Sequence, residues 1–528
     1  MNDQYYGIFR FVEPVDESFL RRSGRMPGNV FRGDSANRGE VFKNLPRELF
    51  INPTPWERIA ANDRPGAPER WGIHQLLDDL IGSTIADHAR LMARLDGAEL
   101  ERLLALMLIA GDPYHMSGVH NQLWYEDPVS GTLHPIVWDL RLLGWHHPPP
   151  GANWNRLWRA ILRDPRALDG ALTRVAEMVD GGLVEKACER LDATYATYRD
   201  HFQYDNLQRG VISPIGSPLG CAALLAKNVA VLRSWMLDAR VAERIVRLDE
   251  STWLLDVRSL GRAAAVLEGL ETDAPGPVEL YADVDGDGTL DAGDRELELV
   301  RTPAGLDLAT AERLPAACAT FQAELVPHPL DYRFLVVARG ARTLRARYAN
   351  GHDGAALDAE ELPAGTALSH VGWHPWELGA LERSPARVVE LSGHALLDRD
   401  LVIEPGESLV IAPGTEIELA PFVSVLVKGR LSAEGTPQAP IEVRNADPTL
   451  PFGVFALQGP GASGSRLAHV SFRGGGGALL ERVEYKGSVC VHQAEDVVFE
   501  RCTFADNMRC DDLLNAVQSD VDLTACRF

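Results

Sequence analysis

The C-terminal part of the sequence repeats, and this repeat constrains the fold more than any other feature of the chain. From residue 387 onward, short β-branched runs alternate with glycine-containing turns, as in RVVELSGHALL and SLVIAPGTEIEL. Cys502-x-Phe504 and Cys526-x-Phe528 stand in matching frames 24 residues apart, and Phe472 has a similar setting. A unit of this length cannot bury its apolar face alone, so successive units must stack. The repeat predicts a parallel β-helix.

The sequence between residues 251 and 375 has a different texture. Short runs such as STWLLDVRSL, PVELYADV and DYRFLVVARG are separated by clusters of glycine, proline and aspartate. These runs are rich in the β-branched and aromatic residues that strands favour. They predict a β-sandwich-like module. Residues 351–370 are polar and contain glycine, which is typical of a linker or a long loop.

The N-terminal part combines strand and helix patterns. Residues 5–13 (YYGIFRFVE) alternate bulky apolar and aromatic side chains, as a buried strand does. Apolar residues recur at helical spacing over 71–110 and 154–203. Between these helices, residues 111–144 contain two apolar runs joined by DPVSG, which predicts a strand, a turn and a second strand.

A multidomain α+β chain follows from these patterns, since 528 residues suffice for several domains of ordinary size. The domains are expected at residues 1–250, 251–375 and 376–528. Both ends are expected to be incomplete. The strand at 5–13 has no earlier strand candidate to pair with, and the β-helix stops at Phe528 without the polar cap that a solenoid end needs.

Composition limits the partners. The 75 acidic and 52 basic residues give a formal net charge of −23. So acidic a chain is not expected to bind nucleic acid or an anionic membrane surface. The seven cysteines lack CxxC spacing and predict neither a disulfide framework nor a zinc site. The longest apolar stretch, LLALMLIAG, is too short to span a membrane and favours a buried helix.

A calcium loop is the clearest local motif. The segment DVDGDGTLDAGD places oxygen-bearing side chains at alternate positions, a glycine at the sharp turn and an acid at position twelve, the pattern that wraps one Ca²⁺. The predicted ligands are Asp283, Asp285, Asp287, Thr289, Asp291 and Asp294. Strand-like runs flank the loop, so we expect a calcium-stapled hairpin rather than a helix pair. The alternative is an acidic turn without metal.

Residues 111–144 carry the most specific resemblance in the chain. A His-Asn pair precedes the aromatic run LWYEDPVSGTLHPI, and Trp138-Asp139-Leu140 follows it. Together with the opening segment YYGIFRFVEPVDESFL, this order resembles the CotH kinase family (spore coat protein CotH-like), over roughly residues 5–205. Members of that family resemble protein kinases in fold. The resemblance implies an atypical protein kinase that uses ATP and Mg²⁺ to transfer a phosphoryl group to protein hydroxyls.

The resemblance also implies residue roles. Asn121 and Asp139 match the metal-binding amide and carboxylate, and Glu13 matches a glutamate near the adenine site. The catalytic base is expected to be Asp112 or His115, although both depart from the family's spacing. The glycine-rich cover and the lysine for the phosphates would lie before residue 5, so this fragment alone is expected to be inactive. The alternative is that these polar residues only cap turns and satisfy buried backbone groups.

The C-terminal repeat resembles the right-handed, pectate-lyase-like β-helix, which occurs in polysaccharide-cleaving enzymes and in passive stalks. Fold alone does not decide between them. The leading hypothesis is a CotH-like kinase in an extracytoplasmic, secreted or cell-surface protein, because loops of this kind bind calcium at extracellular concentrations. Its partners would be a protein substrate or a surface polymer or glycan. The alternatives are a non-catalytic binding pseudokinase and a carbohydrate-cleaving β-helix.

Overall fold

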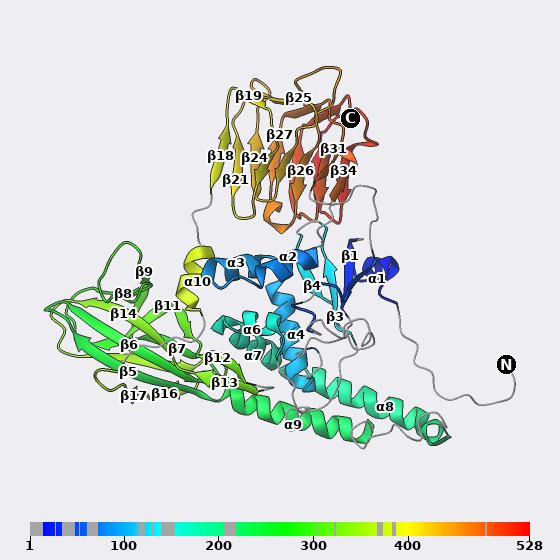
Figure 1. The fold of residues 1–528 in the computed structure, drawn as a ribbon. Helices are drawn as coiled ribbons and strands as arrows, with labels where there is room; N and C mark the ends of the chain where they lie inside the picture. The colour runs from blue at the N-terminus through cyan, green and yellow to red at the C-terminus, as the bar shows by residue number, and fades with distance from the viewer. Residues whose placement is uncertain are drawn as a thin grey trace.

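The structure is a computed structural model in which a helical part, a β-sandwich and a β-helix lie side by side (Figure 1). It describes residues 14–26, 28–33, 48–51, 53–60, 72–112, 115, 122–128, 131–138, 154–204, 218–303, 305–321, 324–366, 373–382, 387–480 and 483–528.

Helices form the central part. They are α1 (Glu17–Arg22), α2 (Gly72–Asp79), α3 (Ile85–Ala93), α4 (Gly97–Ala110), α6 (Arg156–Ile161), α7 (Pro165–Asp180), α8 (Leu183–Tyr204) and α9 (Pro218–Met236). Helix α4 begins where the Asp96 side chain accepts a hydrogen bond from the Glu99 N–H, and it ends at Gly111 in the left-handed conformation. Its apolar side chains pack against α7 and α9. The helices predicted over 71–110 and 154–203 are confirmed.

A small antiparallel sheet adjoins these helices, in the order β2-β1-β3-β4. Its strands are β1 (Asn29–Gly33), β2 (Trp56–Ala60), β3 (Gln122–Glu126) and β4 (Leu133–Pro135). The predicted strand, turn and strand within 111–144 is therefore confirmed as the β3–β4 hairpin. The sequence did not indicate β1 and β2, because five-residue runs with mixed polarity lack a clear period. The strand expected at 5–13 lies outside the described residues. The kinase-like arrangement of this part stays a prediction.

The middle module is a sandwich of two sheets. One has the order β10-β11-β7-β15-β16, and the other β17-β5-β6-β14-β8-β9. The first sheet contains β10 (Leu299–Thr302), β11 (Gly305–Leu314), β7 (Ala265–Thr272), β15 (Leu344–Asn350) and β16 (Ala356–Leu357). The second contains β17 (Glu360–Glu361), β5 (Ala239–Arg247), β6 (Thr252–Gly261), β14 (Leu330–Ala338), β8 (Val278–Ala282) and β9 (Arg295–Leu297). Both sheets bury apolar side chains in one shared core, including Leu267 and Phe334.

Two boundaries differ from the sequence expectation. The first sandwich strand begins at Ala239 rather than near residue 252, because β5 carries charges and does not alternate cleanly. The stretch 351–370, expected to be a linker, contributes the short edge strands β16 and β17. Strands of two residues are too short to leave a periodic pattern, so only pairing with β15 and β5 reveals them.

The sandwich is joined to the helices by a hairpin and by a short helix. The hairpin consists of β12 (Ala317–Phe321) and β13 (Glu324–His328), and its Cys318 and Leu325 side chains pack in the helical core. Before helix α10 (Pro375–Glu382), the Trp373 N–H donates to the Arg163 carbonyl oxygen at 2.8 Å. Trp376, within α10, belongs to the sandwich core. These contacts bury side chains of one part within the other.

The C-terminal part is a parallel β-helix of three sheets, so this prediction is confirmed (Figure 1). The first sheet contains β18 (Val388–Leu391), β21 (Ser408–Ile411), β24 (Arg430–Glu434), β27 (Arg466–Ala468), β32 (Val497–Glu500) and β35 (Val521–Thr524). The second contains β19 (His394–Leu397), β22 (Glu416–Leu419), β25 (Ile441–Asn445), β28 (Val470–Arg473) and β33 (Thr503–Ala505). The third contains β20 (Leu401–Ile403), β23 (Val425–Val427), β26 (Phe455–Gln458), β31 (Gly487–His492) and β34 (Asp512–Val517).

An aromatic ladder runs through the end of this β-helix. The rings of Phe472 and Phe504 stack with centroids 5.6 Å apart, and those of Phe504 and Phe528 with centroids 5.0 Å apart. The ladder confirms that the repeated Phe positions occupy equivalent places in successive coils. Phe472 is 1% exposed, whereas Phe528 is 66% exposed.

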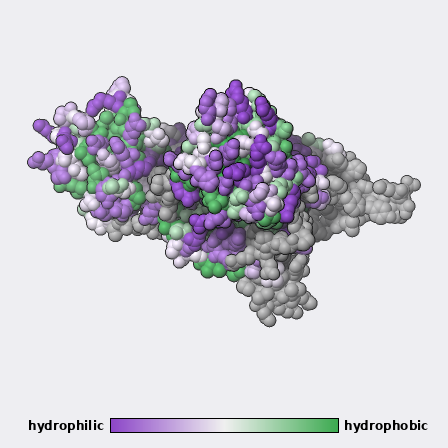
Figure 2. Space-filling model, turned by 90° about the horizontal axis from the view of Figure 1, so that it is seen from above, coloured by the Kyte–Doolittle hydropathy of each residue, from purple (hydrophilic) through white to green (hydrophobic). Residues whose placement is uncertain are grey.

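Seen from above, the described surface is a mixture of hydrophilic areas and smaller hydrophobic areas (Figure 2). Among the described residues, no helix combines the length and the hydrophobicity that a membrane span requires.

The ladder leads to a stability prediction. Replacing Phe472 with alanine should destabilise the β-helix by about 3–5 kcal/mol, because it removes a buried ring and leaves a cavity. Phe528→Ala removes the same side chain from an exposed position and should cost about 0.5 kcal/mol. Denaturant unfolding of both variants measures the difference. Equal losses would contradict the burial of the Phe472 ring.

Candidate functional sites

A buried acid and histidine pair follows helix α4. The left-handed turn at Gly111 redirects the chain, and the Asp112 N–H donates to the Met107 carbonyl oxygen at 3.1 Å. Asp112 is completely buried, and His115 is 3% exposed. The His115 Nδ1 lies 2.6 Å from the Asp112 Oδ2. The two residues proposed from sequence as alternative bases are thus direct partners.

The other ring nitrogen of His115 has a different setting. A proton on Nδ1, shared with the Asp112 carboxylate, leaves Nε2 as the acceptor nitrogen. This Nε2 is buried, and none of the described residues gives it a hydrogen bond. A buried acceptor without a partner carries a desolvation cost, which is often tolerated where chemistry requires the atom.

Two amide side chains hold the backbone at His115. The Gln122 Nε2 and the Asn155 Nδ2 donate to the His115 carbonyl oxygen at 3.2 and 3.1 Å. Asn155 also caps helix α6, because its Oδ1 accepts from the Trp158 N–H at 3.0 Å. Sequence analysis missed both residues. Asn155 directly before RLWRAI has the form of an N-cap and could have been found.

Three residues predicted for the nucleotide and metal, Glu13, Asn121 and Asp139, lie outside the described residues. Asn121 directly precedes Gln122 in the sequence, and Asp139 directly follows Trp138. The Ile136 N–H donates to the Leu123 carbonyl oxygen at 2.8 Å. This bond extends the β3–β4 pairing toward its open end, the end at which Gln122 contacts the His115 backbone.

The predicted calcium loop connects β8 and β9, which pair as antiparallel strands, so the predicted strand-flanked hairpin is confirmed. Asp283 is buried, and its two carboxylate oxygens accept hydrogen bonds from the Gly286 and Gly288 N–H groups, each at 2.8 Å. Both glycines have positive φ, which supports the choice of glycine at these turns.

The structure brings three of the six predicted calcium ligands together. One carboxylate oxygen each of Asp283, Asp285 and Asp287 lies within 4.8 Å of the others. Asp294 folds back toward the start of the loop, where its Oδ1 accepts from the Val284 N–H at 3.3 Å and its Oδ2 from the Asp291 N–H at 2.9 Å.

The remaining predicted ligands of the loop make local hydrogen bonds. The Asp287 Oδ1 accepts from both the N–H and the hydroxyl of Thr289, each at 2.6 Å. The Asp291 Oδ1 accepts from the Gly293 N–H at 2.6 Å. Asp291 and Asp294 belong to the loop but lie outside the group of three carboxylates.

Crowded negative charge characterises the loop. The pKa of Asp283 is raised to about 6, first by burial and then by the nearby Asp285 and Asp294, against the opposing effect of the Gly288 and Gly286 N–H groups. The Arg333 guanidinium only partly offsets this charge, since it donates to the Gly286 carbonyl oxygen at 2.7 Å and to the Asp256 carboxylate at 2.8 Å. Carboxylate oxygens arranged in this way are the hard ligands that Ca²⁺ prefers.

A carbohydrate-cleaving β-helix would need acidic side chains for catalysis, and the candidate Asp and Arg residues from the sequence are Asp496, Arg501, Asp506, Arg509, Asp511 and Asp512. Asp496, Arg501, Asp506 and Arg509 have positive φ. The Asp506 Oδ2 lies 2.9 Å from the Arg473 Nη1, and the Asp506 side chain is largely exposed. These features indicate corner residues of a solenoid with solvated charges.

Comparisons with known proteins do not assign a family. No family model and no curated protein matches the chain. A solved structure, the catalytic unit of the thermostable GH87 alpha-1,3-glucanase from Streptomyces thermodiastaticus strain HF3-3, aligns with 55% of this chain and 58% of that chain. The identity is 12% and the TM-score is 0.16. A TM-score this low carries no argument about fold or activity.

The contacts of Asn155 generate a prediction. Asn155→Ala removes the cap of α6 and a donor to the buried His115 carbonyl, and should cost about 2 kcal/mol. Asn155→Ser keeps a capping oxygen and loses only the donor, so it should cost about 1 kcal/mol. Denaturant unfolding of the helical part tests both. Equal costs would mean that the cap contributes nothing.

Proposed function

We propose that the helical part of the chain is a phosphoryl-transfer domain of the CotH kinase type, acting with ATP and Mg²⁺ on protein hydroxyls. In this proposal the sandwich and β-helix belong to an extracytoplasmic protein and attach the domain to a surface or matrix. The observation that carries the proposal is the buried Asp112–His115 pair at the end of α4, held against the first residue of the β3–β4 hairpin.

The order of the elements supports this assignment. Protein kinases place a catalytic aspartate, then a metal-binding asparagine, then a metal-binding aspartate along the chain. Here Asp112 follows α4, Asn121 directly precedes β3, and Asp139 follows β4 by four residues. When bound, Mg²⁺ would neutralise charge on the phosphates, and Asn121 and Asp139 would be the residues to hold it.

The local geometry favours His115 as the group that accepts the hydroxyl proton. Its Nε2 takes no hydrogen bond from the part of the chain that the structure describes, while the Asp112 carboxylate orients Nδ1 and would stabilise the ring once it is protonated. The Gln122 and Asn155 amides fix the backbone that carries the ring. In this arrangement Asp112 is a positioning residue, because its carboxylate is bound to the His115 Nδ1.

The burial of Asp112 and His115 also favours a second candidate function. If neither group of the pair can be reached by a substrate hydroxyl, the domain is a pseudokinase, and the protein acts by binding a protein or a surface polymer. The two functions differ in whether nucleotide binding leads to transfer.

Nucleotide binding and transfer test the proposal on the longest form of the protein. Calorimetry should detect Mg²⁺-dependent ATP binding that Asp139→Ala abolishes. His115→Gln should retain binding and lower the rate of phosphorylation by about 10²–10⁴, the usual contribution of a general base. Asp358→Asn, at an exposed site in the sandwich, is the matched control. Binding without transfer would establish the pseudokinase, and the lack of ATP binding would overturn the kinase assignment.

We also propose that the loop between β8 and β9 binds one Ca²⁺ and rigidifies the sandwich. The support is the group formed by Asp283, Asp285 and Asp287, together with the raised pKa of Asp283. A divalent cation would relieve the repulsion between these carboxylates.

Calcium should therefore raise the thermal midpoint of the sandwich at pH 7. At ten times its dissociation constant, linkage gives about 1.4 kcal/mol, or a shift of several degrees. Chelation should reverse the shift, and Asp283→Asn should remove it, whereas Asp358→Asn should keep it. If neither calcium nor chelator changes the thermal midpoint of the wild type, the acidic turn folds without metal.

A further inference from the structure

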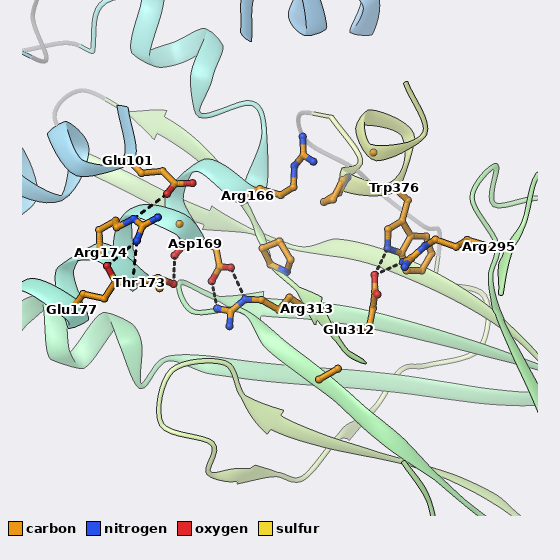
Figure 3. Close-up of a pocket in the computed structure, with 15 residues that line it drawn as sticks. Glu101, Arg166, Asp169, Thr173, Arg174, Glu177, Arg295, Glu312, Arg313 and Trp376 are labelled. Carbon is orange, nitrogen blue, oxygen red and sulfur yellow. Dashed lines mark hydrogen bonds and ion pairs between the residues drawn. The ribbon is translucent and has the colours of Figure 1, made fainter. Parts of the chain in front are cut away.

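A cleft of about 680 Å³, with many charged side chains in its lining, lies between helix α7 and the sandwich (Figure 3). Its first wall is one face of α7, where Arg166, Asp169, Thr173, Arg174 and Glu177 recur at helical spacing. The other wall comes from β9, β11 and α10. The volume is in the range of sites that take small molecules.

The ion pair between Asp169 and Arg313 joins the two walls of the cleft. The Arg313 guanidinium donates to both oxygens of the Asp169 carboxylate, at 2.8 Å from Nε and 2.7 Å from Nη2. Such a bidentate pair fixes the relative position of α7 and β11. Arg313 also donates to the Gly351 carbonyl oxygen at 2.9 Å.

A second cluster lies on the helical wall. Arg174 binds the Glu177 carboxylate at 2.8 Å, and its Nε lies 3.4 Å from the Glu101 Oε2. Burial raises the pKa of Glu101, although Arg174 lowers it. Gly170 lets Glu101 approach the helix, because a Cβ at this position would lie 2.4 Å from the Glu101 Oε1.

A third cluster lies on the sandwich wall. The Glu312 Oε1 accepts hydrogen bonds from the Arg295 guanidinium at 2.5 Å and from the Trp376 Nε1 at 2.7 Å. Trp376 is only 4% exposed, so its ring offers little surface to a ligand in the cleft.

The charges of the cleft cancel. Among the described residues, four arginines and four carboxylates line it, and each of these arginines is in an ion pair with a carboxylate, which for Arg166 is Asp164 beside the cleft. A phosphate or carboxylate ligand would find no uncompensated cation, and a metal ion would find carboxylates already bound to guanidinium groups. An apolar ligand would bury all of these groups without hydrogen bonds.

A neutral ligand rich in hydroxyl groups meets none of these objections. Each hydroxyl can donate to a carboxylate and accept from a guanidinium, whose five N–H donors exceed those used in one ion pair. We propose that the cleft between α7 and the sandwich binds a neutral oligosaccharide, through the exposed edges of the ion pairs around Arg174 and Glu312. This site is separate from the Asp112–His115 pair and from the calcium loop.

Calorimetric titration of the full chain with neutral gluco-, manno-, galacto- and chito-oligosaccharides, without nucleotide, tests the proposal. At least one series should bind saturably, and Arg174→Ala should weaken that binding tenfold or more. Arg174 pairs only with carboxylates of the helical part in the contacts described above, so the variant leaves the Asp169–Arg313 joint in place. Arg233→Ala removes an exposed arginine that pairs with Asp180 outside the cleft, and it should bind like the wild type.

A second variant leaves every charge in place. Gly170→Ala favours the helical backbone and displaces the Glu101 carboxylate from its position, so it should also weaken binding about tenfold while the fold is retained. Thermal unfolding checks that both variants fold.

Two results would overturn the proposal. The first is that no oligosaccharide binds, or that a charged ligand titrated in the same way, such as glycine or inorganic phosphate, binds in the cleft instead. The second is sugar binding that Arg174→Ala and Gly170→Ala leave unchanged, which would place the sugar elsewhere, such as on the β-helix. Neither result bears on ATP binding, so this proposal and the kinase proposal fail separately.

Discussion

The position of the helical part relative to the sandwich depends on the Asp169–Arg313 ion pair. Asp169 lies on α7 and is mostly buried, and both of its oxygens are bound by one guanidinium from β11. Removing Arg313 would leave the mostly buried Asp169 carboxylate without this partner, which costs far more than the intact pair contributes. The β12–β13 hairpin adds apolar contacts next to this joint, because Cys318 and Leu325 belong to the helical core. Directional and apolar contacts together hold the walls of the cleft.

The β-helix depends on a different constraint, the parallel register between successive coils. Each strand takes its backbone hydrogen bonds from the coils before and after it, so equivalent side chains must stack. The Phe472, Phe504 and Phe528 rings follow this rule. Turns at non-glycine residues such as His469 and Gln493 have positive φ. Stacking with neighbouring coils stabilises these left-handed backbone conformations, and the local sequence does not predict them.

The two candidate sites differ in how far sequence could predict them. The calcium loop is local, because alternate carboxylates and two glycines within twelve residues largely set its geometry. The structure agrees for Asp283, Asp285 and Asp287. The sequence indicated Asp112 and His115 as alternative catalytic bases and did not predict that they contact each other. The supports of this pair, Gln122 and Asn155, come from a strand and from a helix that follow later in the chain. Contacts of that kind depend on packing, so spacing along the sequence does not reveal them.

The sequence by itself determined the elements whose signal is periodic or local. These are the helices around α4, the β3–β4 hairpin, the acidic loop and the stacked coils, because each follows from a repeat or from turn chemistry within a short window. The tertiary structure alone decided where the parts meet. The pairing of the short edge strand β17 with β5, the packing of the β12–β13 hairpin in the helical core, and the charge-balanced cleft all bring together residues far apart in sequence. A pairing across more than a hundred residues, such as Asp169 with Arg313, leaves no pattern in either segment.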